Sequence, residues 1–329
     1  MVMNRLSAIL DEFANRHLLV VGDLMLDRFI WGEVERLSPE APVPVLRVVH
    51  EKTSLGGAAN VIHNVRSLGG QVTACGIVGK DDAGGRILGA LKKVGASTAG
   101  VFIDRDFQTI QKSRVIASPH HQQIVRLDRE NRQPIGRATL KKLCRFIAAK
   151  AGGVDAIVIS DYGKGAVHDE LLYAVAAVVD ERKIICVVDP KKENYERYRL
   201  PTLVTPNKIE ASEAAGIPIT DEATLRMAGT KLLRKWRAQA VLITRGAEGM
   251  SLFRPRLPVR HFPTAPRDVF DVTGAGDTVV AVCALALAGG AAYEEAAVLA
   301  NLAAGFVGDE VGTVAVSIEK LRRIIEDKT

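Results

Sequence analysis

Cysteines are few in this chain, and long apolar runs are missing. Only four of its 329 residues are cysteines, and they lie far apart, at positions 75, 144, 186 and 283. Such spacing does not match a disulfide framework or a thiolate metal site, so we expect buried free thiols in a reducing compartment. No apolar run reaches the roughly 18 residues that a membrane-spanning helix needs, and the first residues do not resemble a signal peptide. We therefore expect a cytoplasmic protein with no membrane partner.

Aromatic residues are scarce, and neither sign of charge dominates strongly. Phe, Trp and Tyr make up 5% of the chain, and 44 basic residues stand against 38 acidic ones, a net charge of +6. Basic and acidic residues are interspersed without an aromatic-basic ladder, so no nucleic-acid partner is expected. The mild positive excess is compatible with phosphorylated small-molecule substrates.

Several well-known signatures of phosphate and metal chemistry are also missing. The chain has no Walker A motif, no GxGxxG after its first predicted strand and no protein-kinase catalytic loop. Its seven histidines have no metal-ligand spacing. These absences argue against a P-loop NTPase, a protein kinase and a zinc enzyme.

Strand-like and helical segments alternate along most of the chain. The apolar run at 17–21 is typical of a buried parallel strand, and the alternation after it predicts an α/β fold. We expect a doubly wound, mainly parallel sheet with helices on both faces. Two β-rich interruptions, at about 28–53 and 104–127, are too short to fold alone. Both would follow strand ends, where ligands bind in open α/β sheets, so they predict a small β-sheet lid on a single domain spanning 1–329.

The most informative segment is 268–278, Asp-Val-Phe-Asp-Val-Thr-Gly-Ala-Gly-Asp-Thr. Gly274, Ala275 and Gly276 are small enough for consecutive backbone N–H groups to converge on an oxyanion. The apolar run after them predicts a buried helix whose N-terminus adds partial positive charge. Asp277 would lie in the first turn of that helix, beside the bound anion. A carboxylate there can accept the proton of a hydroxyl that attacks a phosphoryl group, which indicates a kinase.

Two further groups of residues are candidates for binding a sugar. Asp23 and Asp27 follow the first strand, where carboxylates accept hydrogen bonds from neighbouring hydroxyls; a helix or turn cap at Asp23 and an ion pair at Asp27 are the alternatives. Gly56 and Gly57 would let a ligand approach the backbone at a helix start, and Asn60 could bind hydroxyls. Plain turn chemistry is the alternative for the two glycines.

Two segments in the second half of the chain are candidates for binding the nucleotide and its metal. Asn207 and Glu210 lie three apart at a predicted helix start, and their oxygens suit Mg²⁺ held through water. A capping box is the alternative, and the two roles are compatible. Thr244 and Gly246 end a strand in a turn, where a hydroxyl and an open backbone could contact nucleotide phosphates.

Basic residues gather in the second predicted lid segment. Lys112, Arg114 and Arg126 lie there, and Lys164 follows a later strand. A substrate with a second phosphate needs cations remote from the transferred one, and these residues could supply them. A solvated lid face is the alternative interpretation.

Residues 271–277 resemble the C-terminal signature of the PfkB, or ribokinase-like, carbohydrate kinases, and 56–60 and 207–210 fall where that family has its other motifs. A narrower resemblance, to the kinase module of heptose-7-phosphate kinase/ADP-heptose synthase, is carried by three segments, 36–45, 122–128 and 160–165. No His-x-Gly-His motif follows, so we expect no nucleotidyltransferase domain, and either a monofunctional kinase or a kinase module on its own.

The resemblance implies a reaction and its partners. The reaction is transfer of the ATP γ-phosphoryl group to the C1 hydroxyl of D-glycero-β-D-manno-heptose 7-phosphate, in ADP-heptose and lipopolysaccharide core synthesis. The implied cofactors are ATP and Mg²⁺, and a monovalent cation such as K⁺ stays open. The implied partners are the sugar phosphate, a second copy bound through the lid, and a separate adenylyltransferase and phosphatase. A PfkB-type kinase of another sugar, such as ribose or a fructose phosphate, and a non-catalytic sugar-phosphate sensor are the alternatives.

The resemblance also assigns roles to residues. Asp277 becomes the catalytic base and 274–276 the anion hole. The implied sugar and sugar-phosphate contacts are Asp23, Asp27, Gly56, Gly57, Asn60, Lys112, Arg114, Arg126 and Lys164. The implied nucleotide and Mg²⁺ contacts are Asn207, Glu210, Thr244, Gly246, Asp271 and Thr273.

Overall fold

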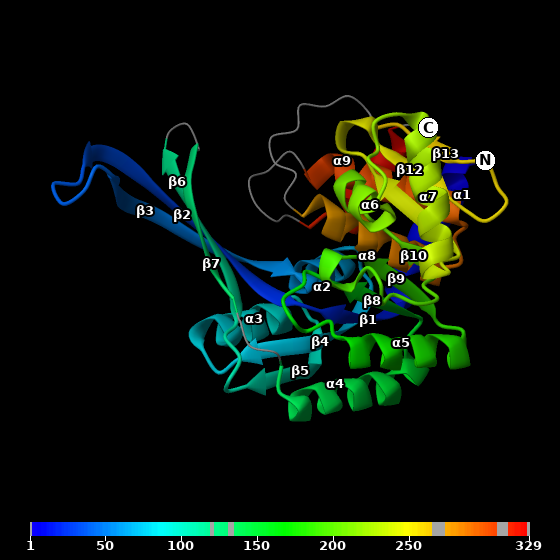
Figure 1. The fold of residues 1–329 in the computed structure, drawn as a ribbon, viewed down its shortest axis with the longest axis horizontal. Coiled ribbons are helices and arrows are strands. Elements are labelled where there is room, and N and C mark those ends of the chain that lie inside the picture. Colours follow the sequence, from blue (N-terminus) through cyan, green and yellow to red (C-terminus); the bar gives the residue numbers. More distant parts are fainter. Residues whose placement is uncertain (1, 119–121, 131–134, 265–273, 308–314, 328–329) are drawn as a thin grey trace.

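The main body is built around one large sheet (Figure 1). A computed structural model describes residues 2–118, 122–130, 135–264, 274–307 and 315–327. Nine strands follow the order β13-β12-β11-β10-β9-β8-β1-β4-β5. Neighbours from β5 to β11 are parallel, and β12 and β13 add two antiparallel strands at one edge. The strands are β1 His17–Gly22, β4 Gln71–Gly79, β5 Ser97–Asp104, β8 Ala156–Ser160, β9 Ile185–Asp189, β10 Leu203–Val204, β11 Ala240–Thr244, β12 Met250–Phe253 and β13 Arg260–Phe262.

Helices cover both faces of this sheet. In β1, Leu18 and Val20 belong to one buried cluster and Leu19 and Val21 to the other, because successive side chains of a strand point to opposite faces. One face carries α4 Arg137–Lys150, α5 Asp169–Arg182, α6 Lys208–Ala215 and α7 Glu222–Trp236. The other carries α1 Val2–Asp11, α2 Ala58–Ser67, α3 Asp82–Lys93, α8 Ala275–Ala288, α9 Tyr293–Val307 and α10 Ile318–Glu326. Figure 1 shows α4 and α5 on one side and α2 and α8 on the other, so the predicted doubly wound fold is confirmed.

Short 3-10 turns and two terminal helices complete the body. The turns are η1 Phe13–Asn15, η2 Ala151–Gly153, η3 Lys192–Asn194 and η4 Gly246–Glu248. The sequence pattern did not predict α1 or α10, which are short and contact each other through one apolar stripe each. None of the described helices is long and apolar enough to cross a membrane.

The central helix α8 is apolar on all sides. Every residue from Asp277 to Leu287 is buried, and the helix packs against α2, α9 and the strands β8 and β9. Such a helix is stable only inside a core. This packing fixes the start of α8, and with it Asp277, beside the residues that follow β8 and β9.

A second, four-stranded sheet projects from the body (Figure 1). Its order is β3-β2-β6-β7, with β2 Leu24–Leu37, β3 Pro44–Gly57, β6 Ile110–Ser118 and β7 Gln122–Arg129. These strands largely coincide with the predicted lid segments, and we call them the lid sheet. Gly56 and Gly57 end β3, and Gly57 is the N-cap of α2, which begins at Ala58, so the two glycines lie at a helix start as predicted.

Candidate active site

The first turn of α8 presents free backbone to the surroundings. Gly274 is its N-cap with φ +87°, and no side chain caps the helix there among the described residues. A Cβ built on Gly276 would meet nothing within 4 Å. Ala275 lies between them at the partly exposed end of the helix. These features suit an anion at the helix N-terminus; Asp271 and Thr273, which were predicted to contact the nucleotide, lie outside the described residues.

Asp277, in the first turn of α8, is 3% exposed and held at both carboxylate oxygens. The Asn60 amide Nδ2 donates to Oδ2 at 2.8 Å, and the Tyr162 hydroxyl donates to Oδ1 at 2.7 Å. Burial raises the pKa of Asp277 to about 6, and the two hydrogen bonds oppose that rise. A carboxylate with a pKa just below neutrality is ionised at pH 7 and still able to hold a proton, as a general base requires.

Polar contacts join α2 to α8 at this point. Besides the bond between Asn60 and Asp277, the Thr278 hydroxyl donates to Asn64 Oδ1 at 3.0 Å, and Asn64 Nδ2 donates to the Asn60 carbonyl at 3.0 Å. Asn60 is fully buried, and its side-chain oxygen has no hydrogen-bond partner among the described residues. An unsatisfied buried acceptor beside Asp277 fits a ligand that brings a hydroxyl donor.

Asp23 is fully buried behind this point and is occupied by backbone donors. Its carboxylate accepts from the N–H groups of Tyr162, Lys164 and Ala166, at 2.9 to 3.1 Å. Burial raises its pKa, and these three bonds oppose the rise. Gly57 lies close by with φ +56°, and a Cβ there would come within 2.6 Å of the Asp23 carbonyl. Asp23 thus organises the 162–166 loop, and a direct role in holding a sugar stays a prediction.

Asp27 lies where the lid sheet joins the body. The Arg114 guanidinium binds its carboxylate at 2.7 Å, and both side chains are largely buried. A Cβ on Gly56 would lie 2.3 Å from Asp27 Oδ2, so glycine is what lets this carboxylate fit. The charge of Asp27 raises the pKa of Asp277, which places the two carboxylates near each other.

Lys112 approaches the same place from β6 of the lid sheet. Its ammonium lies 5.1 Å from the centre of the Tyr162 ring, and its charge lowers the pKa of Asp277. Burial lowers the pKa of Lys112 itself, which the charge of Asp27 opposes. The structure therefore brings Lys112, Asp27, Asn60 and Asp277 together, and their role as a sugar site stays a prediction.

The other two predicted phosphate ligands each pair with a carboxylate. Arg126 pairs with Asp128 on β7, its side chain is 52% exposed, and it lies opposite Arg114 in the strand register. Lys164 forms an ion pair with Glu130. Both cations are thus already neutralised by a neighbour, so a phosphate would have to displace a carboxylate to bind them.

Asn207 and Glu210 form the capping box that begins α6. Asn207 Oδ1 accepts from the N–H groups of Ile209 and Glu210, and Glu210 Oε2 accepts from the Asn207 N–H. Glu210 Oε1 also accepts from the Lys191 ammonium at 3.0 Å. Thr244 lies beside Asn207 in an isolated bridge, and Gly246 follows in η4.

Oxygen ligands and excess negative charge at this edge fit a hydrated Mg²⁺. Desolvation raises the pKa of Asp189 well above its usual value, and the charges of Glu210 and Asp277 raise it further. Among the described residues, no three His, Cys, Asp or Glu side chains are grouped to hold a metal by themselves. Mg²⁺ usually keeps several waters and shares substrate phosphates, so one or two carboxylates suffice.

Sequence reasoning missed Tyr162, Asp189 and Lys191. Tyr162 follows β8, and Asp189 ends β9, so both lie at strand ends of the parallel sheet, where ligands bind. Their position after apolar runs was the available signal. Nothing in the local sequence indicates that the Tyr162 hydroxyl reaches Asp277.

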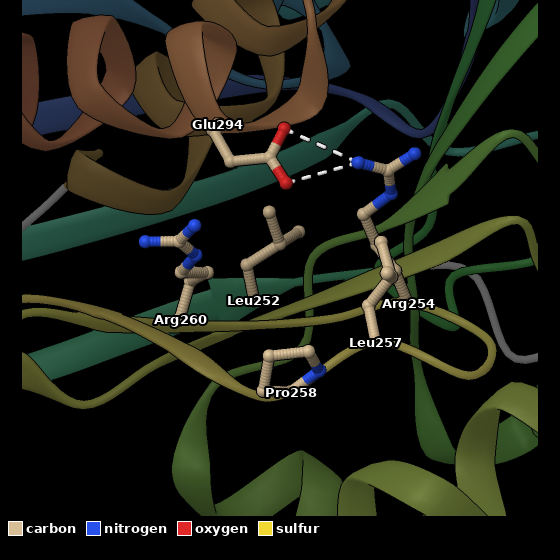
Figure 2. A pocket seen from close by; sticks show the side chains of 6 residues that line it. All are labelled: Leu252, Arg254, Leu257, Pro258, Arg260 and Glu294. Carbon is tan, nitrogen blue, oxygen red and sulfur yellow. Dashed lines mark hydrogen bonds and ion pairs between the residues drawn. The ribbon is translucent and has the colours of Figure 1, made fainter.

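A small surface pocket of about 70 Å³ lies elsewhere, between β12, β13 and α9 (Figure 2). Figure 2 shows Arg254 reaching Glu294 across it, at 2.9 Å. Its other lining residues are Leu252, Leu257, Pro258 and Arg260. Because its one carboxylate is bound by Arg254 and none of the residues around Asp277 line it, we do not assign the chemistry to this pocket.

Known proteins are similar to this chain in sequence and in fold. The chain is 50% identical over 299 residues to the bifunctional protein HldE of Geobacter metallireducens, which covers 91% of this chain and 61% of that protein. It is 42% identical over 316 residues to the bifunctional protein HldE of Desulfatibacillum aliphaticivorans, with 96% and 64% covered. The chain therefore spans less than two thirds of the length of these curated relatives.

Solved structures support the fold. Phosphofructokinase-2 from Escherichia coli in complex with potassium has a TM-score of 0.79 at 21% identity, over 95% of this chain and 98% of that one. Ribokinase from Arabidopsis thaliana, complexed with ribose and ATP, has a TM-score of 0.74 at 19% identity, over 94% and 99%. A model of the pfkB family carbohydrate kinases matches residues 15–321. The chain therefore belongs to the pfkB family of carbohydrate kinases, as its motifs predicted.

Proposed function

We propose that this chain transfers the γ-phosphoryl group of ATP to the C1 hydroxyl of D-glycero-β-D-manno-heptose 7-phosphate. One observation carries the proposal: Asp277 is buried at the open N-terminus of α8, and hydrogen bonds hold both of its oxygens. A carboxylate beside an anion site is repulsive unless it accepts a proton there. The heptose substrate rests on the resemblance of 36–45, 122–128 and 160–165 and on the bifunctional HldE relatives.

Different residues carry out different parts of the phosphoryl transfer. Asp277 accepts the proton of the sugar hydroxyl as its oxygen attacks the γ-phosphorus. Backbone N–H groups at 274–276 stabilise the charge on the transferred group, and the loss of one such donor costs about 3–4 kcal/mol in comparable sites. The orphaned side-chain oxygen of Asn60 accepts a second sugar hydroxyl. Mg²⁺, held near Asn207 and Glu210, would neutralise charge on the nucleotide phosphates.

The lid sheet supplies the cations for the remote phosphate. Lys112 lies near Asp277, so it would face a sugar phosphate whose C1 hydroxyl reaches the base. Arg114 is bound to Asp27 and would have to exchange that carboxylate for the phosphate. Arg126 and Lys164 already pair with Asp128 and Glu130, and Arg126 is also exposed, so we expect them to contribute less. Closure of the lid sheet over the sugar would exclude water and protect ATP from hydrolysis.

We propose a homodimer through the lid sheet. Large apolar side chains are exposed along it: Leu37 at 65%, Val48 at 51%, Val49 at 59% and Leu127 at 54%. Such residues on a projecting sheet are typical of a protein contact. Phosphofructokinase-2 from Escherichia coli has a tetrameric inhibited form, which is a finding about that protein.

We place the reaction in the cytoplasm, ahead of a phosphatase and an adenylyltransferase. We expected a separate adenylyltransferase, and the relatives correct this, since their names give two functions to one protein. A K⁺ requirement is also a proposal, and exchange of K⁺ for Na⁺ in the assay tests it.

The first test is ADP release with Mg-ATP and a panel of heptose 7-phosphate, ribose, fructose 6-phosphate and fructose 1-phosphate. We expect turnover with the heptose phosphate alone. Turnover on another sugar would keep the kinase chemistry and overturn the substrate. The absence of turnover with every sugar would favour the alternative function, a non-catalytic sugar-phosphate sensor.

A further inference from the structure

We propose that Tyr162 is a positioning residue, whose hydroxyl holds the Asp277 carboxylate in the orientation that accepts the substrate proton. The inference rests on the proposed function, since it takes Asp277 as the base. The sequence motifs gave this tyrosine no role of its own. It is carried by the contacts of Tyr162 on both sides, with Asp277 at its hydroxyl and Asp23 at its backbone.

The hydrogen bonds on Asp277 leave room for the substrate. Tyr162 occupies one acceptor position of Oδ1, at 2.7 Å, and Asn60 occupies one of Oδ2, at 2.8 Å. Each carboxylate oxygen has two lone pairs, so one stays open on each. Two donors on different oxygens prevent the carboxylate from rotating, and the open lone pairs keep a fixed direction.

Tyr162 is itself held from three sides. Its backbone N–H donates to Asp23 Oδ2 at 2.9 Å, and the same carboxylate binds the N–H groups of Lys164 and Ala166. Lys112 lies over its ring, 5.1 Å from the centre. The buried Asp23 therefore holds the 162–166 loop in place, and this loop positions the Tyr162 ring. The Tyr162 hydroxyl in turn orients the Asp277 carboxylate.

The Tyr162 hydroxyl also affects the pKa of the Asp277 carboxylate. Burial and the nearby charge of Asp277 raise the pKa of Tyr162 well above its usual value, so it stays a donor. A donated hydrogen bond stabilises the ionised carboxylate, and this opposes the effect of burial on Asp277. The other groups that act on this pair are Asn60, Asp27, Lys112 and Asp189.

The variant Tyr162→Phe distinguishes a positioning role of Tyr162 from a purely structural one. The variant keeps the ring under Lys112 and removes only the donor. Without it the pKa of Asp277 should rise by about one unit, because the ionised carboxylate loses a charge-assisted hydrogen bond that water replaces only in part. We expect the acid limb of the kcat/KM pH profile to move upward accordingly. This shift alone should lower kcat/KM about fivefold at pH 6. The lost orientation should also keep kcat below the wild-type value near pH 8.5, where the carboxylate is ionised in both proteins.

The matched control is Tyr198→Phe. Tyr198 is fully buried, whereas Tyr162 is half-buried, and it likewise donates to a buried carboxylate, Asp161 Oδ2, at 2.6 Å. Tyr198→Phe removes the same hydroxyl oxygen as Tyr162→Phe, so the two variants should lower the thermal unfolding temperature to a similar extent. Its acid limb should stay where the wild-type limb lies. Substrate ionisation is common to all three proteins and cancels in the comparison.

The outcomes are distinguishable. An acid limb that is unmoved in Tyr162→Phe, or moved equally in Tyr198→Phe, overturns the positioning role. Normal turnover in Asp277→Asn overturns the proposed base, and the inference with it. If Tyr162→Phe does not fold, as judged by circular dichroism, 3-fluorotyrosine placed at 162 keeps the shape and strengthens the donor. The acid limb should then move downward, and an unmoved limb again overturns the proposal.

Discussion

The body side of the site and the lid side hold their charged groups differently. On the body side, Asp277 and Asp23 are buried, and hydrogen bonds from Asn60, Tyr162 and backbone N–H groups fix both carboxylates. On the lid side, Arg126 is 52% exposed and pairs with a carboxylate two residues away. Buried hydrogen bonds fix geometry, whereas exposed ion pairs exchange partners readily and contribute little. We infer that the body side sets the chemistry and the lid side sets which sugar phosphate is accepted.

The largest expected effect is on the body side, at Asp277. Asp277→Asn keeps the shape and removes the proton acceptor, so turnover should fall at least about a hundredfold. ATP affinity should change little, because the backbone N–H groups at 274–276 remain. Steady-state kinetics and nucleotide titration measure the two effects, and near-normal turnover would remove Asp277 from the role of base.

The next effect is on stability, at Asp23. Asp23→Asn places an amide donor against a site built from backbone donors, which should cost about 2–4 kcal/mol of unfolding free energy. Asp82→Asn is the matched control, because its carboxylate is 81% exposed and pairs with Arg86 within one helix. That variant should lose less than about 0.5 kcal/mol in urea unfolding. Equal losses in the two variants would contradict the distinction between buried and exposed carboxylates.

A smaller effect is expected where the lid sheet meets the body. Lys112→Met should raise the KM for the sugar phosphate about tenfold and leave the KM for ATP nearly unchanged, since its ammonium lies beside Tyr162 and near Asp277. Arg126→Met should change either KM less than about twofold, because its guanidinium is exposed and already paired. A larger effect at Arg126 than at Lys112 would place the remote phosphate farther out on the lid sheet.

The smallest catalytic effect is expected at an exposed position in the middle of β3. Val49→Asp changes a side chain that is 59% exposed and lies on β3. It should leave the unfolding temperature within about 2 °C of the wild type. If the lid sheet forms a dimer, sedimentation should show a monomer in place of the wild-type dimer. A wild-type monomer, or an unaffected dimer in the variant, would contradict that assembly.

The sequence predicted the fold and singled out Asp277 as the candidate base because both leave local patterns. Alternating strands and helices gave the sheet, and a small-residue cradle followed by Asp277 and an apolar helix gave the centre of the site. The capping box at Asn207 was also foreseen as an alternative and is present. Each of these depends on residues within a few positions of one another.

The supporting contacts could not be predicted in this way. Tyr162 bonds to Asp277 across 115 residues, and Asp23 bonds to Tyr162 across 139. No local period encodes which hydroxyl meets which carboxylate after the sheet has formed. For the same reason the sequence assigned Asp23 to the sugar, although its oxygens accept three backbone bonds.

The distance along the chain between the partners of Asp277 has a consequence for folding. Asn60 is 217 residues away from Asp277, and Tyr162 is 115 away. Contacts of such long range form late, because the loop-closure entropy is lost before the contact compensates for it. A chain emerging from the ribosome has its β1 and lid sheet long before the last of these partners is synthesised. Competence for catalysis should therefore appear only in the final phase of refolding, after most of the secondary structure has formed.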